Sequence, residues 1–148
     1  HVIHDMAELA SKGNPDKIGA FDARGFLFGT PMALRMHRPF FPIRKAGKLP
    51  GDCEKITYTT EYSEDSIEVQ KASVQPGDKV VLVDDVLATG GTMLAGINAV
   101  EKLGGTVVGC VVLANLAFLP GQERVCEGRR PDFVKALATY DFLEDTGC

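Results

Sequence analysis

Residues 80–83 form an uninterrupted run of Val, Val, Leu and Val that leads directly into Asp84 and Asp85. A short apolar run of this kind is typical of a strand buried on both faces of a parallel sheet. Comparable runs, one of them alternating between polar and apolar residues, predict further strands at residues 17–21, 40–43, 66–70 and 107–113.

Helical spacing of apolar residues separates most of these strands. It predicts one helix over residues 2–10, a second after Gly25 and a third after Thr92. This order predicts an α/β fold in which helices flank a parallel twisted sheet, as one domain over residues 1–148. Residues 44–66 lack sustained apolar periodicity, so we expect an irregular, functional segment there.

The two acids require a chemical explanation, because adjacent like charges repel unless a cation or hydrogen-bond donors lie between them. A sugar diol would supply such donors, and a magnesium ion would also satisfy the carboxylates. The glycines in residues 89–92 allow backbone N–H groups to converge at the start of the next helix, which favours phosphate binding. Together these features predict a site for a phosphorylated sugar.

The composition excludes several other functions. The formal net charge is −4, so we expect neither nucleic acid nor a membrane as a partner. The four cysteines have no C-x-x-C spacing, which argues against zinc and a disulfide framework and favours a reducing compartment, the cytoplasm. Because the chain begins at His1 rather than at methionine, we expect a segment to precede it.

Residues 80–92 resemble the phosphoribosyl pyrophosphate signature of type I phosphoribosyltransferases. This resemblance implies that a ribose 5-phosphate group is bound by Asp84, Asp85, Ala88, Thr89, Gly90, Gly91 and Thr92. Residues 21–29 look like the pyrophosphate-binding loop of the adenine phosphoribosyltransferases. The family often holds this loop in a cis peptide, which would be Asp22–Ala23 here, with Arg24 on the pyrophosphate.

Two further segments are similar to that family. Residues 44–51 resemble its basic stretch, which assigns Arg44, Lys45 and Lys48 to the pyrophosphate. The pair Glu61 and Tyr62 resembles the one in its mobile catalytic loop, and it implies proton transfer by Glu61 and packing over the site by Tyr62. The lid would then cover residues 44–66. The match around residue 116 suggests that Leu116 contacts adenine, whereas the family's N-terminal hood has no counterpart and residues 124–148 receive no role.

The resemblance implies purine salvage: adenine and phosphoribosyl pyrophosphate would give AMP and pyrophosphate, with Mg²⁺ as the cofactor and a homodimer as the assembly. Three alternatives stay open. The chain could be a related enzyme acting on xanthine, hypoxanthine or orotate, or a non-catalytic regulator that binds phosphoribosyl pyrophosphate. It could also be a plain doubly wound domain with an unrelated ligand, although that reading does not explain the paired acids.

Overall fold

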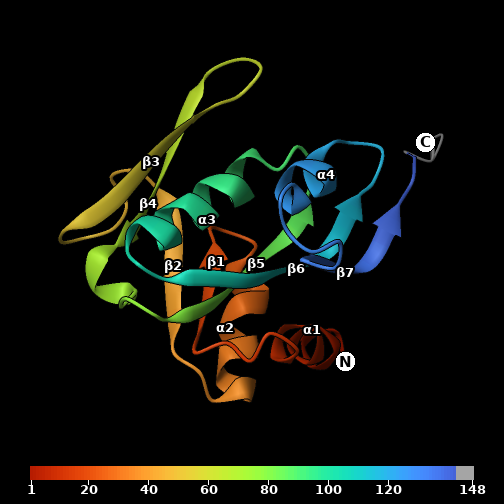
Figure 1. The fold of residues 1–148 in the computed structure, drawn as a ribbon, viewed down its shortest axis with the longest axis horizontal. Coiled ribbons are helices and arrows are strands. Elements are labelled where there is room, and N and C mark those ends of the chain that lie inside the picture. Colours follow the sequence, from red (N-terminus) through yellow and green to blue (C-terminus); the bar gives the residue numbers. More distant parts are fainter. Residues whose placement is uncertain (143–148) are drawn as a thin grey trace.

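The computed structural model describes residues 1–142, which form a seven-stranded sheet with helices on both faces (Figure 1). The helices are α1 (Val2–Ser11), α2 (Phe26–Met36), α3 (Gly91–Lys102) and α4 (Gly121–Cys126), with a short 3-10 helix at Lys71–Ser73. The strands are β1 (Lys17–Phe21), β2 (Phe40–Lys45), β3 (Cys53–Thr59), β4 (Glu64–Gln70), β5 (Lys79–Leu87), β6 (Thr106–Leu116) and β7 (Val134–Tyr140).

The strand order is β3-β4-β2-β1-β5-β6-β7. Strands β2, β1, β5, β6 and β7 run parallel to one another, which confirms the predicted parallel sheet with flanking helices. β4 adds antiparallel to β2, and β3 adds antiparallel to β4, so the complete sheet is mixed. The strand over residues 134–140 lies in the part of the sequence for which no role was predicted.

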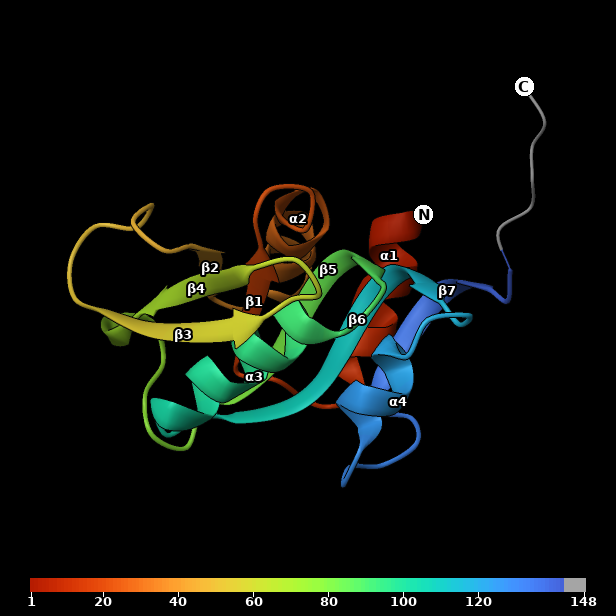
Figure 2. The same ribbon diagram turned by 90° about the horizontal axis from the view of Figure 1, so that it is seen from above.

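The alternation of side chains along β5 separates two apolar cores. Val80 and Leu82 face α3, where they join Ile97 and Val100. Val81 and Val83 face the opposite side and pack with residues of α1 and α2. Figure 2 shows α1 and α2 on one face of the sheet and α3 on the other. Burial on both faces explains why residues 80–83 are all apolar.

The prediction of an irregular segment over residues 44–66 is wrong. β3 and β4 form an antiparallel hairpin in register, with Ile56 opposite Ile67. Within β3 only Ile56 is buried, so most side chains of that strand are at least partly exposed and give no apolar pattern. The tip of the hairpin extends beyond the body of the domain (Figure 1). Within residues 1–142, no helix is long and apolar enough to cross a membrane.

Candidate active site

The carboxyl ends of β1, β2 and β5 meet at one edge of the sheet, where ligands of such folds bind. A cavity of about 430 Å³ opens there, between the strand ends and the β3–β4 hairpin. Residues from three of the predicted segments line it: Asp22, Ala23, Arg24, Lys45, Asp84, Asp85, Ala88 and Thr92. The fold therefore brings together side chains that are far apart in the sequence.

The acid pair lies within β5 rather than after its end. β5 continues to Leu87 and stays paired with β6, so the predicted end of this strand at Val83 is too early. The backbone N–H of Asp85 donates to Asp84 Oδ1 over 2.8 Å. Burial, reinforced by the side chain of Asp85, raises the pKa of Asp84 to about 8. The raised pKa favours the protonated form of Asp84, so the pair carries less negative charge than its sequence suggests.

The loop after β1 provides the counter-charge for these acids. Arg24 Nε lies 2.7 Å from Asp85 Oδ2, and the Arg24 side chain is 76% exposed. The Asp22–Ala23 peptide bond is cis, as the resemblance predicts. Gly25 allows the loop to fold back closely on the end of β1, because a Cβ at this position would lie 2.4 Å from the carbonyl oxygen of Phe21. Although it is paired with Asp85, the guanidinium is exposed and could bind an anion in the cavity.

The phosphate loop, defined here as residues 88–92, runs from the end of β5 into the first turn of α3. Gly90 has φ +86°, a conformation that favours glycine, and α3 begins at the next residue. The N–H groups of the first turn of a helix lack partners within the helix and favour an anion. Tyr58 reaches this turn from β3, with its hydroxyl 3.0 Å from Thr92 Oγ1. Tyr58 also lines the cavity, and its position could not be inferred from the sequence.

The basic segment, residues 44–51, begins with the last two residues of β2 and continues into a turn, called the basic turn below, that a buried carboxylate holds. Glu68 is 8% exposed, and its Oε1 accepts hydrogen bonds from Gly47 N–H (3.0 Å) and Leu49 N–H (2.9 Å). Arg44 Nε lies 3.1 Å from Asp22 Oδ2, which connects this turn to the loop after β1. Lys45 lines the cavity, whereas Lys48 does not. Glu68 was missed because a single glutamate in an alternating strand is unremarkable.

The structure does not bring every predicted residue into the cavity. Glu61 and Tyr62 lie in the connection between β3 and β4, where Tyr62 is 95% exposed, and neither lines the cavity. Asp65, on β4 of the same hairpin, does line it. Leu116 ends β6 and also lies outside the lining.

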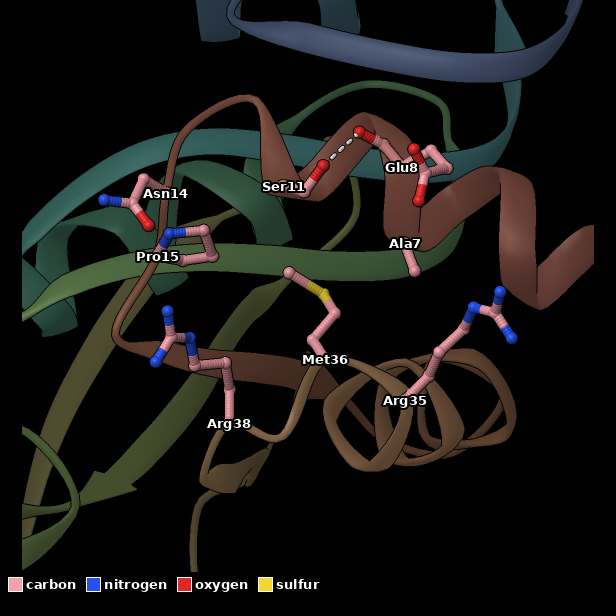
Figure 3. Close-up of a pocket in the computed structure, with 8 residues that line it drawn as sticks. All are labelled: Ala7, Glu8, Ser11, Asn14, Pro15, Arg35, Met36 and Arg38. Atoms are coloured by element: carbon pink, nitrogen blue, oxygen red, sulfur yellow. Dashed lines mark hydrogen bonds between the residues drawn. The ribbon is translucent and has the colours of Figure 1, made fainter.

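A second cavity, of about 520 Å³, lies away from these residues, between α1 and α2 (Figure 3). Arg35 and Arg38 come from α2 and the residues after it, and Glu8 and Ser11 come from α1. Arg35 already contacts His4 Nδ1 at 2.5 Å. No residue that the sequence assigned to the site lines this cavity. The chemistry predicted from the sequence therefore belongs to the cavity at the strand ends.

Comparison with known proteins agrees with this geometry. Residues 1–132 match the model of the phosphoribosyl transferase domain. The adenine phosphoribosyltransferase of Mycoplasmopsis pulmonis is 47% identical over 84% of this chain and 72% of its own length. That of Agathobacter rectalis is 48% identical over 95% of this chain and 78% of its own length.

Solved structures show the same likeness. The adenine phosphoribosyltransferase of Thermoanaerobacter pseudethanolicus superposes with a TM-score of 0.83 at 40% identity, covering 93% of this chain and 80% of that one. The enzyme of Trypanosoma brucei, solved with AMP, pyrophosphate and ribose 5-phosphate, has a TM-score of 0.81 at 35% identity, covering 99% and 68%. This chain belongs to the phosphoribosyltransferase family and, within it, to the adenine phosphoribosyltransferases.

Proposed function

We propose that this chain transfers the phosphoribosyl group of phosphoribosyl pyrophosphate to adenine, giving AMP and pyrophosphate in purine salvage. One observation carries the assignment to this cavity. The acid pair, the exposed guanidinium of Arg24 and two residues of the phosphate loop, Ala88 and Thr92, all line it, whereas Thr89, Gly90 and Gly91 do not. These groups match the hydroxyls, the 5-phosphate and the pyrophosphate of that substrate.

The sugar phosphate would bind across β5 and the start of α3. Asp84 and Asp85 would accept hydrogen bonds from the ribose hydroxyls. The amides of Ala88–Thr92 and the threonine hydroxyls would hold the 5-phosphate, where the α3 dipole favours negative charge. This arrangement would place the anomeric carbon towards the centre of the cavity.

The leaving pyrophosphate would lie against the loop after β1. Arg24 and the backbone of Asp22 and Ala23 would contact it, with Lys45, Arg44 and Lys48 approaching from the basic turn. Fixed positive groups of this kind stabilise charge that develops on the leaving group, and removal of one typically costs about 3 kcal/mol of transition-state stabilisation. The ring oxygen of the ribose would share the positive charge left on the anomeric carbon.

Magnesium is the cofactor that this family uses with phosphoribosyl pyrophosphate. Within residues 1–142, no group of three or more His, Cys, Asp or Glu side chains is placed to hold a metal ion. The carboxylates of Asp84 and Asp85 are hard oxygen ligands that suit Mg²⁺, but two adjacent acids are too few for a complete protein site. The ion would therefore enter with the substrate, neutralise part of its phosphate charge and take at most one or two ligands from this pair.

The β3–β4 hairpin would act as the lid. Closure would bring Glu61 to the purine, where its carboxylate would exchange a proton near N7, and would lay Tyr62 over the reacting groups. It would also exclude water, which competes with adenine as the nucleophile. Leu116 would contact the adenine ring.

The assembly would be a homodimer located in the cytoplasm. Leu27 and Leu34 are 68% and 77% exposed on α2, and their spacing of seven residues places them on one side of that helix. A partner subunit would cover this apolar side. The cysteines at positions 53, 110 and 126 are all free, which fits a reducing compartment.

A base panel tests the proposal. The protein is incubated with Mg²⁺, phosphoribosyl pyrophosphate and one base at a time, and pyrophosphate release and nucleotide formation are followed. We expect AMP from adenine and little product from hypoxanthine, guanine, xanthine or orotate. Preference for another base would contradict the adenine assignment, and binding of phosphoribosyl pyrophosphate without turnover would indicate a regulator instead.

A further inference from the structure

Helix α4 lies beside the phosphate loop (Figure 1). It donates hydrogen bonds to two consecutive carbonyl groups of that loop. The backbone N–H of Gly121 donates to the carbonyl oxygen of Ala88 over 3.0 Å. Arg124 Nη1 donates to the carbonyl oxygen of Thr89 over 2.6 Å. These two residues come from a part of the chain far from residues 88–92 in sequence, and neither lines the cavity.

The contact between α4 and the loop leaves no spare room. A Cβ on Gly121 would lie 2.2 Å from the carbonyl oxygen of Ala88, and a Cβ on Gly90 would lie 3.1 Å from Gly121 Cα. Both positions therefore require glycine if the loop is to keep this conformation. Val125 of α4 is fully buried in the core on the α3 side, so the helix is itself anchored.

A second anchor joins α4 to the sheet. Asn115, on β6, is 2% exposed, and its side-chain amide donates to the side-chain carbonyl of Gln122. Asn115 pairs in register with Leu87, the residue directly before the phosphate loop. The sheet contacts α4, α4 contacts the loop, and the loop follows directly on the sheet. Of the two hydrogen bonds from α4 to the loop, the one from Arg124 is closer to the start of α3.

The carbonyl orientation matters for anion binding. A carbonyl oxygen carries partial negative charge and repels phosphate, whereas an N–H group attracts it. Hydrogen bonds from α4 hold the carbonyls of Ala88 and Thr89 in fixed directions, and the peptide N–H groups of the same loop are fixed with them. A loop held in this way binds phosphate without having to rearrange first.

We propose that Arg124 is a positioning residue for the 5-phosphate site, which it serves by holding the Thr89 carbonyl against α4. The proposal rests on the proposed function, because it assigns the phosphate loop to the 5-phosphate of the substrate. It gives a role to a residue of the C-terminal segment that the sequence left without one.

The test measures binding of the two ends of the substrate separately. Binding of ribose 5-phosphate and of Mg²⁺-pyrophosphate is measured by calorimetry for the complete protein and for Arg124→Gln, together with the KM values for phosphoribosyl pyrophosphate and adenine. We expect ribose 5-phosphate to bind about tenfold more weakly to the variant, since a hydrogen bond from a charged donor is lost. Pyrophosphate affinity and the KM for adenine should change by less than about twofold, because the hydrogen bond between Arg124 and Thr89 is separate from the proposed sites of both molecules.

Three further variants make the result specific. Arg124→Lys keeps a cationic donor and should restore most of the ribose 5-phosphate affinity. Arg130→Gln removes an arginine whose ion pair is with Asp132 rather than with the loop, and it should bind both ligands as the unmodified protein does. Gly121→Ala should resemble Arg124→Gln or be more severe, because the added methyl group displaces the Ala88 carbonyl.

The outcomes distinguish this inference from the function on which it rests. Equal affinity of Arg124→Gln and the unmodified protein for ribose 5-phosphate would overturn the positioning role alone. A parallel loss of affinity for both ligands would also overturn it, since that pattern indicates general damage to the domain. Failure of the unmodified protein to bind ribose 5-phosphate would reject both the positioning role and the proposed function.

Discussion

Arg24 and Asp85 form an ion pair of 2.7 Å that joins the loop after β1 to the acid pair of β5. In the proposed reaction the two side chains bind different parts of the substrate: Arg24 would bind the pyrophosphate and Asp85 would bind the ribose. In this structure each of the two side chains neutralises the charge of the other. Binding of phosphoribosyl pyrophosphate would exchange this contact for two contacts with the substrate.

Arg24→Gln should therefore lower kcat for AMP formation by roughly 10²–10³-fold, because a preorganised charge at the leaving group is lost. Arg24→Lys should recover only part of this activity, since an ammonium group lacks the planar, two-pronged geometry of guanidinium. Steady-state kinetics at saturating adenine measures the effect. Arg35→Gln, in the cavity between α1 and α2, is the matched control and should retain full activity. Unchanged turnover in Arg24→Gln would remove this residue from the pyrophosphate site.

Asp84 should make the fold less stable as the pH rises. Its pKa is about 8 in the folded chain and about 4 in an unfolded one. Between these values the folded state holds a proton that the unfolded state has lost, so the free energy of unfolding falls with increasing pH. Asp84→Asn removes the titrating group, and the fall should become shallower. Urea unfolding at pH 5, 6, 7 and 8 measures this, and identical pH profiles for both proteins would contradict the raised pKa.

Substrate binding should release a proton at pH 7. Burial favours the protonated form of Asp84, because it raises the pKa of this carboxyl group. Donors from the ribose, together with Mg²⁺ carried by the substrate, favour the charged carboxylate. Titration of Mg²⁺-phosphoribosyl pyrophosphate in buffers of different ionisation enthalpy would detect the released proton, and Asp84→Asn should release less. Proton uptake instead would mean that Asp84 acts as a neutral donor.

Glu61→Gln should lower kcat by roughly 10²–10⁴-fold, the usual contribution of a general acid or base. Its effect on the affinity for phosphoribosyl pyrophosphate should be small, because Glu61 lies outside the cavity that would bind this substrate. Glu64→Gln changes another exposed glutamate of the same hairpin and serves as the control. Comparable losses in turnover and affinity for Glu61→Gln would show that the residue maintains the site rather than transferring a proton.

The parallel part of the fold could be predicted because its strands are buried on both faces. Residues 80–83 and 107–113 are apolar almost throughout for this reason, so they can be identified as strands without deciding which side chains face the core. β3 could not be predicted, since only Ile56 is buried within it and its neighbours are polar. β7 was missed for a similar reason: it lies at the edge of the sheet, and beyond Val134 its side chains are partly or fully exposed.

Part of the candidate site could likewise be predicted from the sequence, and part could not. Residues 80–92 could be interpreted because the acids and the glycines follow one another in the chain, so no long-range contact had to be known. The ion pair of Arg24 with Asp85 and the hydrogen bond of Arg124 to Thr89 depend on how distant segments pack. The support of the basic turn by Glu68 also depends on strand pairing, because it requires β4 to lie beside β2.

The decisive measurement is the affinity for ribose 5-phosphate of the unmodified protein and of the variant carrying both Asp84→Asn and Asp85→Asn, with Mg²⁺-pyrophosphate as the second ligand. If the two acids bind the ribose hydroxyls, the double variant should bind ribose 5-phosphate about a hundredfold more weakly, as expected for two lost charge-assisted hydrogen bonds. It should still bind pyrophosphate through Arg24 and the basic turn. Equal affinity of both proteins for ribose 5-phosphate would show that the acid pair does not hold the sugar, and the proposed site would have to be abandoned.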